Sequence, residues 1–359
     1  MVSNSPLLSK MVSRISAAVR NIGPNLQGQI VLTEAASGPF LATSVLAAVS
    51  GAKHVIACTR DSCWGTAEEI RRFTIELAGR FDVADRIEVS TKPAAEMADG
   101  VDVVTNLGFV RPILPELIRR LSPHASIALM WEPWEFREQD IDLIACREHG
   151  IPVIGTNEHH PYVATFNAVG MFAFKLLFEL QIEVGGLDIL VVGSDPFGKA
   201  CFEVLKAVGA RVLLIDPQYG WSGDIVYSAF ERADAVVLVE HRFQGELLGS
   251  SALPFVETLA RRHTPVVHIC GSIDNNFLKT FGIEKHPVRV VPVGYMTETT
   301  AYMGVKPVVD LHTAGLHVAS IVARERHGGA TIDKALDAAV ASGYGLKLLN
   351  PSESIYMCQ

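Results

Sequence analysis

The stretch ILVVGSDPFGKA, residues 189–200, decides the fold of the second half of this 359-residue chain. Its first four residues predict a buried strand, Gly193 predicts a tight turn, and the run 199–208 predicts a helix. A strand, a glycine turn and a helix in this order begin a βαβ unit, whose strands are parallel. The sequence therefore predicts a parallel α/β sheet in this half.

The same alternation of short apolar runs with longer amphipathic ones extends over nearly the whole chain. A chain of this length exceeds the size at which one hydrophobic core usually stops growing. We therefore expect an α/β protein with two Rossmann-like domains, each a doubly wound parallel sheet, and an interdomain cleft. Strands are expected at 29–33, 54–58, 86–89, 101–105, 126–130 and 152–155, and then at 188–193, 211–216, 235–240, 265–270 and 288–292.

Two adjacent glycines, Gly185 and Gly186, follow the apolar helical run 163–180 and predict a stop and a hinge. This divides the chain into a substrate domain at 1–160, an interdomain helix and hinge at 161–185, and a nucleotide-binding domain at 186–311. The remainder, 312–359, contains two predicted helices. At least one of them is expected to cross back to the first domain.

Composition excludes several classes of partner. The net charge is -8 and no cluster of Lys and Arg is present, which argues against nucleic acid. Asn167 and Lys175 interrupt the most apolar run, so we expect no membrane span, and the N-terminus shows no pattern of a secretory signal. Six scattered cysteines lack metal-ligand spacing and favour reduced thiols in the cytoplasm, with no bound metal.

The turn after residue 192 resembles the glycine fingerprint of dinucleotide-binding folds, with Gly193 and Gly198 at its first and third positions. The second position is Asp195, whose charge would oppose a pyrophosphate at the helix N-terminus. Asp216 lies 18 residues beyond Gly198, where an acidic residue commonly binds ribose hydroxyls. The other expected cofactor contacts are Ser194, Phe197 and His241. A capping role for Asp195, with no ligand, is the alternative.

The order and spacing of these elements resemble the D-2-hydroxyacid dehydrogenases and, more distantly, the S-adenosylhomocysteine hydrolases. The resemblance covers roughly residues 150–326, through the helix at 163–180, the Gly193 turn and the runs 233–238 and 266–271. It implies a nucleotide domain beside a substrate domain, NAD or NADP as cofactor, and a homodimer.

Two positions depart from what the resemblance implies. The arginine that binds the substrate carboxylate is replaced by Cys270, before Gly271, and the acid/base histidine by Val293 and Gly294. With Asp195, these departures leave S-adenosylmethionine open as an alternative ligand, because carboxylates could complement its positive charges.

Further candidates lie where strands of the first half end, since ligands in open α/β sheets bind outside those ends. Glu34, Ser37 and Gly38 follow the first strand, Asn106 follows the fourth, and Trp131 follows the fifth. We expect them to bind substrate. Glu34 as a solvated turn residue and Trp131 as packing between lobes are the alternatives.

Acid/base chemistry is expected of Glu158 and His159, which precede the interlobe helix, and of Glu298, near the position of the missing histidine. A hydrogen-bonding role at the hinge, and N-capping by Thr297, are the competing interpretations. The sequence therefore predicts an NAD(P)-dependent oxidoreductase acting on a small molecule. An S-adenosyl-dependent methyltransferase or hydrolase and a non-catalytic scaffold stay open.

Overall fold

The computed structural model describes residues 6–292 and 295–348. The chain divides into two compact units, one formed by residues 1–164 with 304–359 and one by 165–303. No helix within the described ranges is both long and apolar enough to cross a membrane.

The first unit contains a seven-stranded sheet in the order β14-β6-β5-β4-β1-β2-β3, in which only β14 is antiparallel to its neighbour. The strands are β1 (Ile30–Glu34), β2 (His54–Cys58), β3 (Ile87–Ser90), β4 (Val103–Thr105), β5 (Ser126–Ala128), β6 (Val153–Thr156) and β14 (Gly345–Lys347). Its helices are α1 (Pro6–Ile22), α2 (Ala42–Val49), α3 (Ala67–Gly79), α4 (Pro115–Ile118), α5 (Leu143–Glu148), α11 (Val305–His327) and α12 (Ile332–Ala341).

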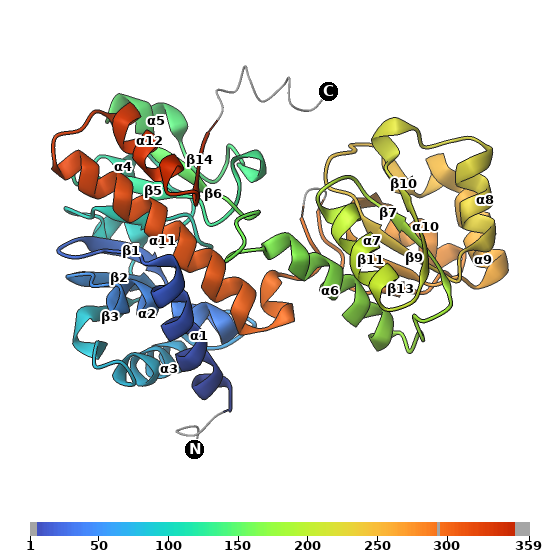
Figure 1. Cartoon of the computed structure of the whole chain (residues 1–359), viewed down its shortest axis with the longest axis horizontal. Coiled ribbons are helices and arrows are strands. Elements are labelled where there is room, and N and C mark those ends of the chain that lie inside the picture. Colours follow the sequence, from blue (N-terminus) through green and yellow to red (C-terminus); the bar gives the residue numbers. More distant parts are fainter. Residues whose placement is uncertain (1–5, 293–294, 349–359) are drawn as a thin grey trace. The chain divides into compact units, whose positions relative to one another are not determined.

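Alternate residues of these strands enter different cores, as expected of a sheet covered on both faces. Val31 of β1 packs with α1, α2, α3 and α11, whereas Leu32 packs with α4 and α5. Figure 1 shows α11 lying across this sheet, with α1 beside it.

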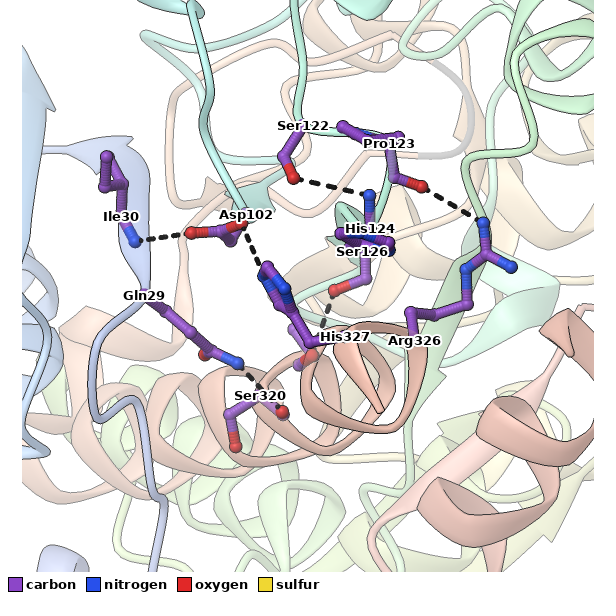
Figure 2. A network of polar contacts seen from close by, with 11 residues as sticks. Gln29, Ile30, Asp102, Ser122, Pro123, His124, Ser126, Ser320, Arg326 and His327 are labelled. Carbon is purple, nitrogen blue, oxygen red and sulfur yellow. Dashed lines mark hydrogen bonds and ion pairs between the residues drawn. The ribbon is translucent and has the colours of Figure 1, made fainter. Parts of the chain in front are cut away.

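A polar network fastens the C-terminal part of α11 to the amino ends of the strands (Figure 2). Asp102 accepts the backbone N–H of Ile30 at 2.9 Å and lies 3.0 Å from Nε2 of His327. The Nε2 of Gln29 donates to the carbonyl of Ser320 at 3.2 Å. The bonds made by His327 and Ser320 join α11 to residues more than 200 positions earlier in the chain, which explains why α11 belongs to the first unit.

The second unit has a five-stranded parallel sheet in the order β13-β11-β9-β7-β8. Its strands are β7 (Asp188–Val192), β8 (Arg211–Ile215), β9 (Ala235–Val239), β11 (Val266–Cys270) and β13 (Lys285–His286), with β10 (Glu246–Leu248) and β12 (Ser272–Ile273) pairing separately. Its helices are α6 (Thr165–Glu179), α7 (Phe197–Ala207), α8 (Asp224–Arg232), α9 (Leu253–Arg262) and α10 (Asn275–Thr280). Helices α6 and α7 cover one face, and α8 and α9 cover the other.

The expectation of a strand at 288–292 is wrong. The fifth strand of this sheet is β13, at Lys285–His286, and Pro287 follows it directly. Proline has no N–H to donate to a neighbouring strand. The apolar side chains beyond it are exposed, 74% for Val288 and 60% for Val290, so the alternation there reflects no buried face.

Candidate functional site

The Gly193 turn joins β7 to α7, and both fingerprint glycines are required by close packing. A Cβ atom on Gly193 would lie 2.7 Å from the carbonyl oxygen of Val239, and one on Gly198 would lie 2.1 Å from that of Gly193. Neither distance can be tolerated by a side chain. The turn therefore has the packing geometry that the first and third glycines of a dinucleotide fingerprint provide.

Asp195, at the second fingerprint position, is exposed at the start of this helix. Within the described ranges, no N–H of α7 donates to its carboxylate, and the residue at the N-cap position is Pro196. Helix capping therefore does not explain Asp195. Its charge is free to act on whatever approaches the turn.

A buried carboxylate that the sequence did not single out accepts hydrogen bonds from the turn. Glu240 follows β9 and is 1% exposed. Its Oε2 accepts the backbone N–H of Ser194 at 2.6 Å, and its Oε1 accepts the hydroxyl of Ser194 at 2.9 Å. Oε1 also accepts the backbone N–H groups of Arg242 and Phe243, at 2.6 and 2.9 Å. One amide of the phosphate-type turn is thus satisfied inside the protein.

Asp216 and His241 border the same turn. Asp216 follows β8 and accepts the backbone N–H of Gln218 at 2.9 Å. Burial raises the pKa of Asp216, and the charges of Glu240 and Asp195 raise it further. Burial lowers the pKa of His241 to about 4, and its ring lies 4.5 Å from that of Phe197. His241 is therefore neutral near pH 7 and forms a wall with Phe197.

These positions meet at the topological switch point of the sheet, where β7 has β8 on one side and β9 on the other. Ligands of open α/β sheets bind at such points. The residues present fit the ribose side of a dinucleotide through Asp216. They fit its pyrophosphate less well, because Asp195 is acidic and Glu240 occupies the Ser194 amide.

The first unit has its own switch point, between β1 and β4, and it brings together two of the expected substrate residues. Glu34 ends β1, is 5% exposed, and accepts the backbone N–H of Phe109 at 3.0 Å. Burial raises the pKa of Glu34, and Arg111 opposes that shift. Asn106 is fully buried, and its Oδ1 accepts the backbone N–H of Met130 at 2.8 Å. The alternative of a solvated Glu34 is wrong.

Trp131 lies at the same edge of the sheet, against an arginine that sequence reasoning missed. The guanidinium carbon of Arg111 is 5.1 Å from the indole centroid, and its Nη1 donates to Asp140 at 2.6 Å. Ser37 and Gly38 follow β1 and begin the short 3-10 helix Gly38–Leu41. A ligand role for these two residues stays a prediction.

Three carboxyl groups surround the end of β6. The backbone N–H of Glu158 donates to Oε1 of Glu132 at 3.0 Å, and that of Glu132 donates to Glu135 at 3.3 Å. Burial raises the pKa of Glu135 to about 7, while a hydrogen bond with the side chain of Glu158 opposes the shift. Two carboxyl groups in contact, one buried (Glu158) and one half-buried (Glu135), hold a proton more readily than either would alone. The pair can therefore exchange a proton near neutrality.

The remaining acid/base candidates differ in their surroundings. His159 is exposed, and its backbone N–H donates to Oδ1 of Asn157 at 3.1 Å. Glu298 is half-buried in the second unit. The neighbouring Thr297 donates its hydroxyl to the carbonyl of His268 at 2.8 Å, so it does not serve as a helix cap. No group of three side chains in the described ranges is placed to hold a metal ion.

Of the two departures from the dehydrogenase pattern, one lies within the described chain. Cys270 ends β11 and is 3% exposed, and burial raises the pKa of its thiol. It offers no positive charge to a carboxylate. The other positions, Val293 and Gly294, lie outside the described residues.

No protein-family description matches this sequence. Comparison with curated proteins finds no match either. Solved structures do match. The A chain of dipicolinate synthase from Bacillus subtilis aligns with a TM-score of 0.54 at 10% identity, covering 86% of this chain and 100% of that one. A structure described as the pyruvate reductase of Chlamydomonas reinhardtii aligns with a TM-score of 0.52 at 13% identity, covering 84% and 98%. At these identities the similarity concerns the fold, and it confirms the two Rossmann-like α/β units expected from the sequence.

Proposed function

We propose that this protein is an NAD-linked oxidoreductase acting on a small molecule. The observation that carries the proposal is the strand–turn–helix at Gly193 and Gly198, with Asp216 at the end of the adjacent strand β8. This arrangement is the one that holds the adenosine half of a dinucleotide. When bound, the nicotinamide would supply or accept a hydride.

The charges of the turn favour NAD over NADP. Asp216 would face the ribose hydroxyls, where a 2′-phosphate would meet its charge and those of Asp195 and Glu240. Charge repulsion within a few ångströms disfavours that ligand strongly when the groups are partly buried. The same charges oppose the pyrophosphate, so we expect binding of NAD to be weak.

The pair formed by buried Glu158 and half-buried Glu135 is the proposed proton donor and acceptor for the substrate. A general acid/base works best when its pKa lies near the working pH, and the pKa of Glu135 is raised to about 7. His159 and Glu298 are the other candidates, because both are accessible and close to strand ends or turns. Substrate contacts are proposed for Glu34, Ser37, Gly38, Asn106 and Trp131.

We also propose a cytoplasmic homodimer. Five cysteines of the described chain are unpaired, which supports a reducing compartment. The dimer follows from the resemblance to the dehydrogenases alone. Both proposals can be checked by localisation of a tagged chain and by sedimentation of the purified protein.

Thermal denaturation with added ligands tests the cofactor assignment. A ligand at 100 times its dissociation constant stabilises the folded chain by about 2.7 kcal/mol. We expect NAD to raise the melting temperature and NADP to leave it unchanged. A rise with S-adenosylmethionine but not with NAD would support the methyltransferase or hydrolase alternative. Binding of NAD without turnover of any 2-hydroxy or 2-oxo acid would support the scaffold alternative.

A further inference from the structure

A small cavity lies between α1, α11 and the loop that follows β6 in the first unit, where α1 and α11 pack side by side (Figure 1). Its volume is about 160 Å³, and its polar lining residues are Arg14, Asn21, Tyr162, Lys306 and Asp310. Pockets for drug-sized ligands measure about 300–1,000 Å³, so this cavity has room for a small ion or a single polar group. All of its lining residues belong to the first unit, whereas the proposed nucleotide turn belongs to the second.

Positive charge gathers at this cavity. Arg14 from α1 and Lys306 from α11 line it, and Asp310 is the one acidic residue in the described lining. A third cation lies nearby, because Nζ of Lys10 is 3.8 Å from the position that a Cβ atom on Gly304, just before α11, would occupy. Lys10 is one helical turn from Arg14 on α1. The side chains around the cavity therefore carry more positive than negative charge.

One of the two lining cations has a partner and the other has none. Lys306 donates to the carboxylate of Asp310, one turn further along α11. Asp310 is buried, and burial raises its pKa while Lys306 and Arg14 oppose that rise. Arg14 is half-buried, yet its guanidinium forms no hydrogen bond or ion pair with any residue in 6–292 or 295–348. A guanidinium has only donors, and its strongest partner is an anion.

We infer that the cavity binds a phosphate group, held by Arg14, Lys306 and Asn21 beside the ring of Tyr162. The arginine and lysine side chains only donate hydrogen bonds, and the asparagine amide and the tyrosine hydroxyl can also donate. A phosphate dianion offers acceptors on every side, and its two charges suit a lining in which the cations outnumber the carboxylate. The ring of Tyr162 stacks on that of His160, with centroids 5.9 Å apart. The site goes beyond the proposed function, which uses none of its residues.

Calorimetric titration of the full chain with inorganic phosphate, in a buffer without other multivalent anions, tests the inference. We expect phosphate to bind the natural protein and Arg14→Gln to weaken that binding about tenfold, because the guanidinium supplies a charge-assisted pair. Lys306→Gln, at a side chain that is 54% exposed, should also weaken binding and leaves the core undisturbed. Asp310→Asn should tighten binding, because it removes the opposing charge and releases Lys306. Arg20→Gln is the matched control, since Arg20 is exposed on α1 and does not line the cavity.

Thermal denaturation separates ligand binding from a structural role. Without phosphate, Arg14→Gln should leave the melting temperature unchanged or raise it, because Arg14 has no partner in the described chain. Phosphate should raise the melting temperature of the natural chain and of Arg20→Gln by mass action, and should raise that of Arg14→Gln less. A clear loss of stability in Arg14→Gln with unchanged phosphate affinity would overturn the inference.

A second ligand identifies the source of the phosphate group. Methyl phosphate that binds at least as tightly as inorganic phosphate would assign the cavity to a phosphorylated small molecule. A clear preference for inorganic phosphate would assign it to the free ion. Equal binding of phosphate and acetate, or phosphate binding that neither Arg14→Gln nor Asp310→Asn changes, would overturn the inference.

Discussion

Glu240 accepts the backbone N–H of Ser194 at 2.6 Å, so the protein's own carboxylate occupies an amide of the turn that would otherwise face a phosphate. The bond joins the ends of β9 and β7, the two strands that flank the switch point of the second unit. The turn is therefore hydrogen-bonded within the protein when no ligand is bound. Glu240 also makes the turn more acidic than a glycine-rich phosphate loop, as does the exposed Asp195.

Loss of the Glu240 carboxylate should destabilise the second unit. In Glu240→Ala, four donors lose their acceptor, and removing one partner from a buried charged network costs about 3–5 kcal/mol. Urea denaturation followed by near-UV circular dichroism should show an earlier transition. Glu257→Ala, on an exposed position of α9, is the control and should change the free energy of unfolding by less than about 0.5 kcal/mol.

The network in Figure 2 predicts a large difference between two neighbouring aspartates. Asp102, with a side chain 9% exposed, bonds both Ile30 and His327, so Asp102→Ala should destabilise the first unit by about 2–3 kcal/mol. Asp99, 73% exposed, pairs with Arg120 at the surface, and Asp99→Ala should shift the urea midpoint much less than Asp102→Ala does. Equal midpoints of the two variants in urea would contradict the assigned role of the network.

The shared proton of Glu135 should make stability fall as pH rises. Its pKa is about 7 in the folded chain and near 4.5 in the unfolded chain, so the folded state binds more protons between these values. Stability contributed by the proton is present below about pH 4.5 and is lost toward pH 7. Glu135→Gln mimics the protonated group and should be more stable than the natural chain at pH 8 by roughly 1–2 kcal/mol. Glu135→Gln and Glu158→Gln should also remove a titration near pH 7 from the kcat profile.

A buried neutral histidine has the opposite effect: it makes the stability of the fold rise as pH rises. His312 is buried in α11, where its Nδ1 lies 2.7 Å from the hydroxyl of Thr43, and burial lowers its pKa to about 3. The unfolded chain binds a proton at His312 below its ordinary pKa near 6.5, whereas the folded chain does not. Stability should therefore fall as pH drops from about 6.5 toward 3. In His312→Gln, the loss of stability between pH 7 and pH 5 should be smaller by roughly 1–2 kcal/mol, measured by urea denaturation.

Strand periodicity predicted most of the two sheets, because buried parallel strands are continuous apolar runs with glycine turns. It missed α1 and β14, which are positioned by packing and pairing with distant segments rather than by a local pattern. It also placed the last strand of the second unit at 288–292. Apolar and polar residues alternate in that segment, but the apolar side chains are exposed.

The candidate site was only partly visible in the sequence for a similar reason. Glycine spacing identified the turn, because the close packing there admits only glycine at positions 193 and 198, and glycines are visible in the sequence. In the sequence, Glu240 is only the last residue of a predicted strand, and Arg111 is only a loop residue. Their contacts with Ser194 and Trp131 depend on which strands are neighbours, and that order is set by the whole sheet. An acidic residue directly after a buried strand was the signal available for Glu240.

The most direct test of the central claim is a calorimetric titration of NAD into the natural chain and into Asp195→Gly. The claim is that the second unit holds a dinucleotide site whose affinity is limited by the charge of Asp195. We predict weak binding to the natural chain and binding about tenfold tighter to the variant, equivalent to about 1.4 kcal/mol. Glu257→Gln, which removes a charge elsewhere on the same unit, should leave the affinity unchanged. Absence of NAD binding by both the natural chain and Asp195→Gly would contradict the account.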